Sequence, residues 1–158
     1  MSRRIRSAEE RFWEKVEKTD ACWNWTGCTT QKGYGTFTIS KGFTRGAHRY
    51  SYQLAKGEIP EGMYLDHVCR NPSCVRPDHL RPVTPSQNAE NQNGHSDSRS
   101  GRRGVSFQSR TGKWMAKATA NGKTYYGGLF SDPDEAARAA LNLRLSIQTH
   151  NDADRRAA

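Results

Sequence analysis

The sequence predicts an α+β fold: a small ββα module, stapled by a metal ion, is linked to a three-stranded antiparallel sheet with one helix. Three observations lead to this prediction. Cysteines and histidines recur at short intervals between two strand-like segments in residues 63–83. A polar stretch rich in Gly and Ser follows. Beyond it, three strand-like segments precede an Ala-rich helical pattern, so the chain is expected to form two modules.

Composition limits how large either core can be. The chain has 158 residues, of which 34% are hydrophobic, and its mean hydropathy is -0.96. Small modules with so little apolar surface usually need a staple. Four cysteines could supply it as disulfides or as metal ligands. The basic N-terminus lacks an apolar signal region and no run reaches membrane-spanning length, so we expect a reducing cytoplasm, no membrane partner and metal-bound thiolates.

The charge distribution predicts a polyanionic partner. The net charge is +9 and the isoelectric point is about 9.7. Basic side chains gain affinity for nucleic acid by releasing condensed counterions. A solvated face would normally mix signs, but residues 99–123 contain seven basic residues and no acidic one. These are Arg99, Arg102, Arg103, Arg110, Lys113, Lys117 and Lys123.

The elements of the first module follow from local signals. A capping box at Ser7 and Glu10 opens a short helix in which Phe12 faces a core and Glu14 pairs with Lys18. Alternation over residues 34–39 predicts a strand that turns at Lys41-Gly42 into a second strand, residues 43–45. Helical spacing covers residues 47–56 and ends at Gly57.

The ββα unit comes next. Residues 63–68 and 80–83 are strand-like, and the loop between them contains Cys69 and Cys74. Thr84 as N-cap, Pro85 at the first helical position and Gln87 at the third predict a helix that carries Asn88 near its start. This unit is too small to hold a core alone, which gives the cysteines a structural purpose.

The second module begins after a flexible linker. Strands are predicted over residues 104–107, 113–120 and 123–130, and Asn121-Gly122 joins the last two as a hairpin. Asp132 caps the Ala-rich helix that follows, whose small side chains suit close packing on a sheet. The expected divisions are 1–92 for the first domain, 93–101 for the linker, 102–150 for the second domain and 151–158 for a disordered tail.

Three residues carry the candidate chemistry. A neutral imidazole at His67 can accept a proton from water that attacks a phosphodiester. Asn88 offers a carbonyl oxygen, and with Asp66 it could bind Mg²⁺ or a similar hard ion. Strand alternation places Asp66 and His67 on opposite faces unless the strand bends, which makes Asp66 the less certain ligand.

A second metal site is predicted from soft ligands. Cys69, Cys74 and His79 have spacings that suit tetrahedral Zn²⁺, but a structural site needs a fourth ligand. Either Cys22 or Cys28 could supply it. A different interpretation of His79 is that it orients the catalytic base His67 instead of binding zinc.

The segment from Cys22 to Asn91 resembles phage HNH endonucleases. The resemblance is carried by Cys-Trp-Asn-Trp-Thr-Gly from Cys22, by Gly-Tyr-Gly from Gly33, by Ala-His-Arg from Ala47, and by Asp-His from Asp66. The spacing of His67, Cys69, Cys74, His79 and Asn88 is also similar to that of His-Cys box homing endonucleases, and both groups are ββα-metal nucleases. The resemblance implies Cys22 as the fourth zinc ligand, Mg²⁺ or Mn²⁺ as catalytic ion, and Arg49 as a phosphate-binding residue.

Residues from Gly104 to about Leu145 resemble the APETALA2-type DNA-binding domain. The matching segments are Gly-Val from Gly104, Lys-Trp-Met-Ala from Lys113, Gly-Gly-Leu-Phe from Gly127 and Glu-Ala-Ala from Glu135. We therefore expect Arg102, Arg103, Arg110, Lys113, Lys117 and Lys123 to contact DNA. If so, removing this domain should abolish site preference before chemistry.

Together these resemblances imply a metal-dependent HNH DNA endonuclease that acts on double-stranded DNA, of the phage homing type, in the host cytoplasm, as a monomer or weak homodimer. A non-catalytic, zinc-containing DNA-binding regulator is the alternative from another class, and such a scaffold would need neither His67 nor Asn88. A restriction or genome-packaging endonuclease with little sequence specificity is a further alternative. Whether one strand or both are cut stays open.

Overall fold

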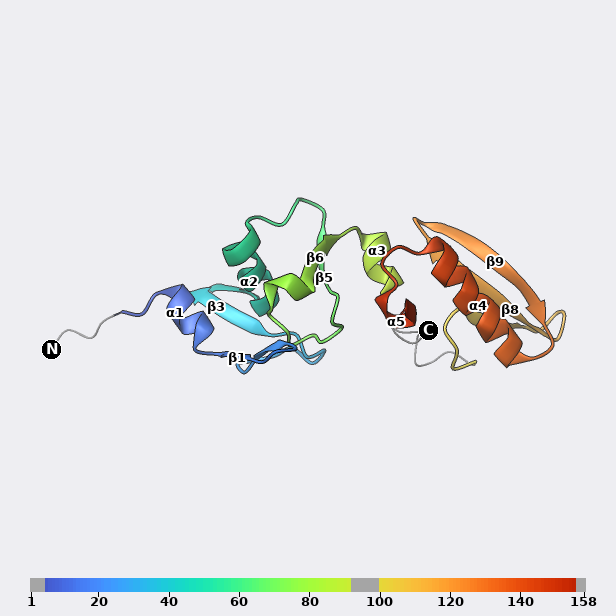
Figure 1. Ribbon diagram of the computed structural model, residues 1–158, viewed down its shortest axis with the longest axis horizontal. Coiled ribbons are helices and arrows are strands. Elements are labelled where there is room, and N and C mark those ends of the chain that lie inside the picture. Colours follow the sequence, from blue (N-terminus) through green and yellow to red (C-terminus); the bar gives the residue numbers. More distant parts are fainter. Residues whose placement is uncertain (1–4, 92–99, 156–158) are drawn as a thin grey trace. The chain divides into compact units, whose positions relative to one another are not determined.

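The computed structural model describes residues 5–91 and 100–155, and the chain folds as two compact units, Met1–Pro82 and Val83–Ala158 (Figure 1). Helices and small antiparallel sheets make up both units, as the sequence predicts. In chain order the elements are α1 (Ala8–Trp13), β1 (Val16–Lys18), β2 (Trp23–Trp25), β3 (Thr36–Ser40), β4 (Phe43–Gly46), α2 (Ala47–Lys56), β5 (Tyr64–His67), the 3-10 helix η1 (Pro77–His79), β6 (Leu80–Val83), α3 (Pro85–Glu90), β7 (Val105–Gln108), β8 (Lys113–Ala120), β9 (Lys123–Phe130), α4 (Pro133–Ile147) and α5 (Asp152–Arg155). No helix of the described residues is long and apolar enough to cross a membrane.

The first helix begins as predicted and ends earlier than expected. Ser7 and Glu10 form the capping box, but α1 stops at Trp13 and the chain turns into β1. The expected Glu14–Lys18 pair is therefore wrong. Glu14 instead forms an ion pair with Arg6, at 2.7 Å. The Lys18 ammonium lies over two indole rings, of which that of Trp23 is 4.3 Å away.

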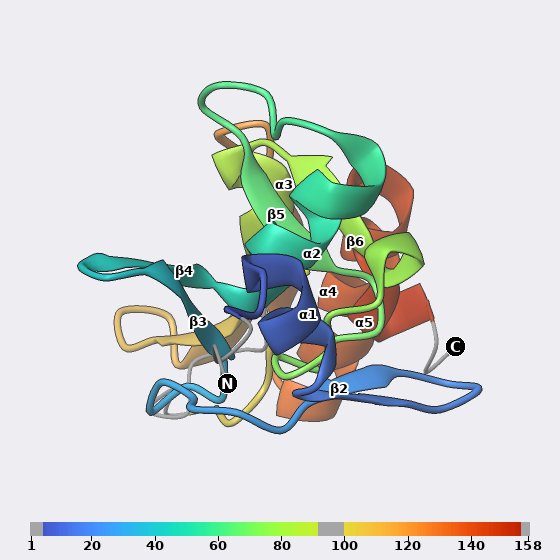
Figure 2. The same cartoon turned by 90° about the vertical axis from the view of Figure 1, so that its left-hand side faces the viewer.

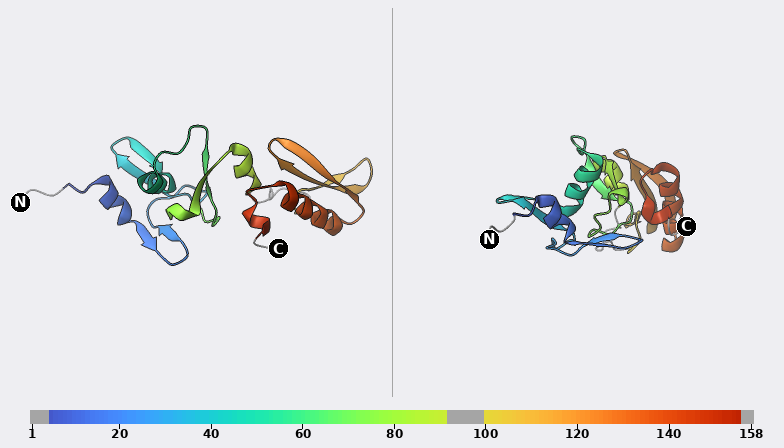
Figure 3. Two further views of the ribbon diagram at one scale, coloured as in Figure 1. Left: turned by 45° about the horizontal axis from the view of Figure 1, so that its top comes forward. Right: turned by 60° about the vertical axis from the view of Figure 1, so that its left-hand side comes forward.

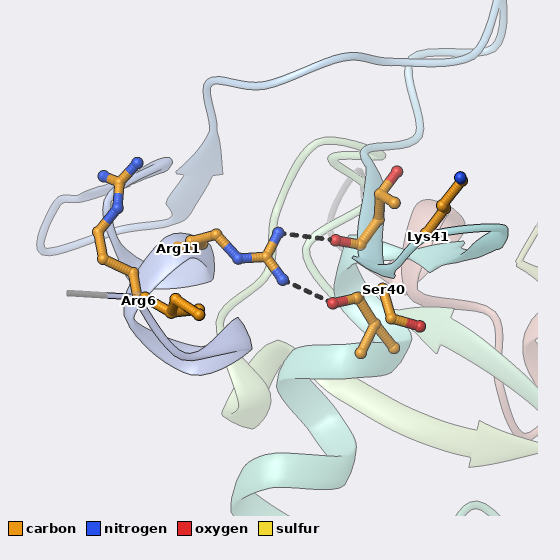
Figure 4. Close-up of a pocket in the computed structure, with 7 residues that line it drawn as sticks. Arg6, Arg11, Ser40 and Lys41 are labelled. Carbon is orange, nitrogen blue, oxygen red and sulfur yellow. Dashed lines mark hydrogen bonds between the residues drawn. The ribbon is translucent and has the colours of Figure 1, made fainter. Parts of the chain in front are cut away.

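The core of the first unit is aromatic. Phe12 is fully buried and packs against Trp25 and Phe37, with ring centroids 5.1 and 5.2 Å apart. Helix α1 packs beside β3 (Figure 2). Arg11 connects the two by donating to the carbonyl oxygens of Thr38 and Ile39, at 3.1 and 2.6 Å (Figure 4). These contacts rim an open pocket of about 640 Å³ that contains none of the predicted site residues. The N-terminal half thus forms a packed platform for α2.

The remainder of the first unit supplies the strands of the site. Helix α2 spans the predicted residues and ends at Gly57, whose φ of 84° few other residues adopt. Strands β5 and β6 pair with each other, as predicted. A second small apolar cluster of Tyr52, Leu65 and Leu80 packs between α2 and these strands. Both clusters are small, in line with the composition.

The second unit contains the predicted three-stranded sheet in the order β7-β8-β9, with α4 packed on one face (Figures 1 and 3). Asn121 and Gly122 both have positive φ, 51° and 74°, which gives the hairpin turn its required geometry. Ala116, Ala136 and Ala140 are fully buried between sheet and helix. Small side chains allow α4 to lie close to the sheet.

Two segments of the second unit differ from expectation. Helix α3, expected in a domain that ends at residue 92, belongs by packing to the unit that begins at Val83 and contacts β8. The expected tail, 151–158, contains the helix α5, and Asn151 is fully buried. Residues 156–158 and most of the expected linker lie outside the described residues. The end of that linker is ordered, since the buried Ser100 hydroxyl donates to the carbonyl oxygen of Val105.

Candidate functional site

Three thiols and one imidazole meet in the first unit. The ligand atoms of Cys22, Cys69, Cys74 and His79 all lie within 4.8 Å of one another. His79 Nδ1 is 3.7 Å from Cys22 Sγ and 3.6 Å from Cys74 Sγ. Tetrahedral zinc, with bonds of about 2.3 Å to sulfur and about 2.0 Å to nitrogen, separates such atoms by about 3.6 Å. The donor set and its spacing therefore fit Zn²⁺, and this Cys/His cluster could bind it.

Each ligand of the cluster is positioned by a short segment. Strand β2 follows Cys22, and the Trp23 carbonyl accepts a hydrogen bond from the Val75 backbone, which brings the Cys74 loop beside it. The 3-10 helix η1 places His79 beside the sulfurs of Cys22 and Cys74. Cys28 is exposed and lies outside the cluster. The structure thus brings together the ligand set that the family resemblance implies.

A hydrogen bond between two thiols of the cluster indicates which proton a bound cation would displace. The Cys69 thiol donates a hydrogen bond to Cys74, which lowers the pKa of Cys74 to about 4 and raises the pKa of Cys69 above its usual range. Backbone amides, among them that of Arg76, also stabilise the Cys74 thiolate. A bound divalent cation would take the place of the shared proton. Metal affinity should consequently rise with pH as Cys69 gives up its proton.

His67 lies at the end of β5 and is 5% exposed. Its Nε2 is 3.0 Å from the Cys74 carbonyl oxygen. Because a carbonyl can only accept, Nε2 carries the proton and Nδ1 carries the lone pair. Burial lowers the pKa of His67, in opposition to the hydrogen bond to Cys74, which raises it. The net shift keeps the imidazole neutral at pH 7, in the tautomer that a base acting through Nδ1 requires.

Asp66 contacts a partner that the sequence analysis did not consider. Arg81 on β6 donates from Nε and Nη2 to one carboxylate oxygen, Oδ2, at 3.2 and 2.9 Å. The pair is largely buried, with side-chain exposures of 10% for Asp66 and 26% for Arg81. Opposite charges on adjacent paired strands are the signal that could have revealed it. Asp66 and His67 therefore contact different partners, Arg81 and the Cys74 loop.

His48 of α2 and Tyr34 of the loop before β3 lie near His67. The ring centroid of His67 is 5.0 Å from that of His48 and 5.8 Å from that of Tyr34. Burial, followed by the charges of His67 and Arg49, lowers the pKa of His48 to about 3. His48 therefore stays neutral and packs against the base. No described residue accepts a hydrogen bond from the Arg49 guanidinium.

Asn88 belongs to the second unit, where it is the fourth residue of α3. The predicted capping box is present: the Thr84 hydroxyl accepts from the Gln87 backbone, and the Gln87 side chain accepts from the Thr84 backbone. The backbone N–H of Asn88 donates to the Thr84 carbonyl oxygen at 2.9 Å. Local sequence therefore sets the start of the helix that carries this candidate ligand.

The predicted DNA-contacting residues divide into two groups. Arg110, Lys113, Lys117 and Lys123 are exposed on the sheet or its turns. Arg102 pairs with Asp134, and Arg103 donates to the Glu90 carbonyl oxygen and contacts Asp154. These internal contacts occupy both arginines. Trp114 and Phe130 are partly buried against the apolar cluster, as core residues rather than stacking platforms.

Comparisons with known proteins identify the region that contains the site. Residues 45–90 match the model of the HNH endonuclease family. This match includes α2, both strands β5 and β6 and helix α3, and with them His67 and Asn88. This part of the chain is therefore similar to an HNH endonuclease domain.

Relatives come from bacteriophages. The chain is 38% identical over 69 residues to Protein 7.7 of Escherichia phage T7, a match of 44% of this chain and 52% of the relative. It is 35% identical over 81 residues to Protein 2.8 of the same phage, covering 51% of this chain and 55% of the relative. The chain thus spans little more than half the length of these relatives. No solved structure matches the chain.

Proposed function

We propose that this protein is a metal-dependent DNA endonuclease in which His67 is the general base. One observation carries the proposal: the buried His67 is held by the Cys74 carbonyl in the tautomer whose Nδ1 carries the lone pair, within a segment that matches the HNH endonuclease family. In this tautomer Nδ1 is the ring nitrogen that can accept a proton. Here the same loop that holds the Cys/His cluster also orients the imidazole.

Hydrolysis would use the His67 imidazole in its neutral form. Nδ1 takes a proton from a water molecule as that water attacks the scissile phosphorus, and the bond to the 3′ oxygen breaks. Proton transfer of this kind typically contributes about 10²- to 10⁴-fold to the rate. The hydrogen bond from Nε2 to the Cys74 carbonyl keeps the ring in place and stabilises the imidazolium that forms.

A hard cation is the second requirement. We assign its ligands as Asn88 and Asp66, and Mg²⁺ or Mn²⁺ as the ion, because amide and carboxylate oxygens suit these metals. When bound, such a cation stabilises the charge on the pentacoordinate phosphate and on the leaving oxygen. Arg81 fixes Oδ2 of Asp66 and so limits how the carboxylate can turn. Arg49 would hold a non-bridging phosphate oxygen.

Zinc is proposed as the structural metal of the Cys22, Cys69, Cys74 and His79 cluster. The spacing of His79 Nδ1 from two of the sulfurs supports this assignment over a role in orienting His67. A cation at this cluster would connect the segment before β2 to the loop that holds His67. The second unit lacks an equivalent cluster among its described residues.

The second unit is proposed to bind double-stranded DNA in the manner of an APETALA2-type domain. On β8, Ala116, Ala118 and Ala120 are buried and Ala116 packs against α4, so by strand alternation Lys117 lies on the opposite face of the sheet with Met115. That open face also contains Arg110 and Tyr126 around a pocket of about 340 Å³. Cations beside aromatic and apolar side chains suit contacts with phosphates and base edges. With a targeting domain, the protein would act as a phage homing endonuclease in the host cytoplasm, as a monomer or weak homodimer.

The alternative is a zinc-containing regulator that binds DNA without cutting it. Supercoiled plasmid carrying the DNA that flanks the encoding gene separates the two functions. The endonuclease nicks or linearises the plasmid with Mg²⁺ or Mn²⁺ and leaves it intact when these ions are withheld. Binding of the plasmid without cleavage in either condition would overturn the proposal. The ratio of nicked to linear product reports the strand count.

A further inference from the structure

Helix α3 ends at a buried carboxylate. Glu90, its last residue, is 3% exposed, although glutamate is rarely buried without a partner. Oε2 of Glu90 accepts hydrogen bonds from the backbone amides of Thr149 and His150, at 2.9 and 3.0 Å. These residues directly follow α4 and its cap. A charged side chain of α3 is therefore held by the backbone of a segment about sixty residues later in the chain.

A second contact joins the same end of α3 to the rest of the C-terminal unit. The Glu90 carbonyl oxygen accepts a hydrogen bond from Arg103, which precedes β7. Arg103 also contacts Asp154 at 3.4 Å, and Asp154 pairs with the buried Arg144 of α4. This network connects α3, α4 and α5. Charge-assisted hydrogen bonds between buried groups are both strong and geometrically demanding.

The two ends of α3 are thus fixed in different ways. The Thr84 capping box fixes its start locally, whereas Glu90 fixes its end to the sheet-and-helix unit. Asn88 lies between them, two residues before Glu90. A six-residue helix is marginal alone, so its orientation depends on these tertiary contacts.

We propose that Glu90 is a positioning residue through which the C-terminal unit holds the Asn88 side chain for metal binding. The C-terminal unit then contributes to chemistry and not to DNA targeting alone. Removing the sheet and helices that follow α3 would remove the support of α3, so cleavage and site preference would be lost together. This inference rests on the proposed roles of Asn88 and of the hard cation.

Variants of the full chain test it. Glu90→Ala removes the acceptor for both amides, whereas Glu90→Gln retains one side-chain oxygen in the same place. Glu135→Ala is the matched control, because Glu135 is an exposed glutamate on α4 of the same unit. For each protein, cleavage rate is measured against Mg²⁺ concentration, DNA affinity is measured in Ca²⁺, and hydrogen exchange is followed for the amides of residues 85–91.

The expected result is a rise of about tenfold or more in the Mg²⁺ concentration for half-maximal cleavage by Glu90→Ala, with faster exchange in α3 and unchanged DNA affinity. Glu90→Gln should shift less and Glu135→Ala should not shift. Simple unfolding would lower the rate at every Mg²⁺ concentration, whereas a positioning defect is overcome by saturating Mg²⁺. Wild-type cleavage with an unchanged Mg²⁺ dependence in Glu90→Ala would overturn the inference alone. No cleavage by wild type would overturn the proposed function and the inference with it.

Discussion

Replacing one of two cysteines that lie six residues apart tests the structural metal site. Cys22 is a member of the Cys/His cluster, whereas Cys28 is exposed and outside it. Both precede β3 in the same unit, and serine has nearly the same size as cysteine. We expect Cys22→Ser to lose zinc and stability and Cys28→Ser to behave as wild type.

The magnitude follows from the geometry of the cluster. The two nitrogen–sulfur separations of 3.6 and 3.7 Å already match tetrahedral zinc, so little reorganisation opposes binding. Structural zinc binding is worth about 10–16 kcal/mol in small domains. Shared over four ligands, this is about 3 kcal/mol for each, so loss of Cys22 should weaken zinc binding roughly 100-fold. Part of that loss should appear as a lower melting temperature, because the clusters around Phe12 and Leu65 are small.

The assay is zinc content by elemental mass spectrometry after dialysis against a chromogenic chelator, followed by thermal unfolding. Wild type and Cys28→Ser should retain about one zinc per chain, and Cys22→Ser should retain much less. Equal zinc content in wild type and Cys22→Ser, or zinc loss confined to Cys28→Ser, would contradict the assignment of Cys22 as a zinc ligand.

Two further predictions concern the second unit. Burial would raise the pKa of Asp154, but hydrogen bonds from Arg144 and the nearby guanidinium charges of Arg144 and Arg103 lower it below its ordinary value of 3.8. The ion pairs of Asp154 therefore stabilise the fold above about pH 4 and are lost as pH falls further. Asp154→Asn should lower the free energy of unfolding, measured with urea, by about 3 kcal/mol at pH 7 and by progressively less below pH 4. A pH-independent difference would contradict this. Lys117→Ala should weaken DNA binding and reduce the slope of log affinity against log salt by about one, measured by fluorescence anisotropy. Arg138→Ala, an exposed change on α4, should leave that slope unchanged.

Elements defined by local chemistry could be predicted from the sequence. The capping boxes at Ser7 and Thr84 and the Asn121-Gly122 turn depend on neighbouring residues, and all three are present. The end of α1 could not be predicted, because the pairing of β1 with β2 overrides helix spacing. Lys18 consequently contacts indole rings rather than Glu14.

The site residues also divide into those that local sequence predicts and those that depend on long-range packing. The three cysteines and the histidine of the cluster follow from ligand spacing and from the resemblance to HNH endonucleases. The Arg81–Asp66 pair depends on strand register, and the Glu90 contacts depend on how distant segments meet. Asn151, expected in a disordered tail, is buried for the same reason. Long-range packing of this kind leaves no periodic signal in one sequence.

Single-turnover cleavage of plasmid by His67→Ala, at saturating enzyme and Mg²⁺, measures how much the His67 imidazole contributes to hydrolysis. Glu135→Ala, an exposed change in the second unit, is the control, and zinc content and DNA affinity confirm that each variant is folded. We expect His67→Ala to cleave about 10²- to 10⁴-fold more slowly than wild type, with DNA affinity retained, and Glu135→Ala to cleave normally. Wild-type rates from folded His67→Ala would contradict the assignment of His67 as the general base.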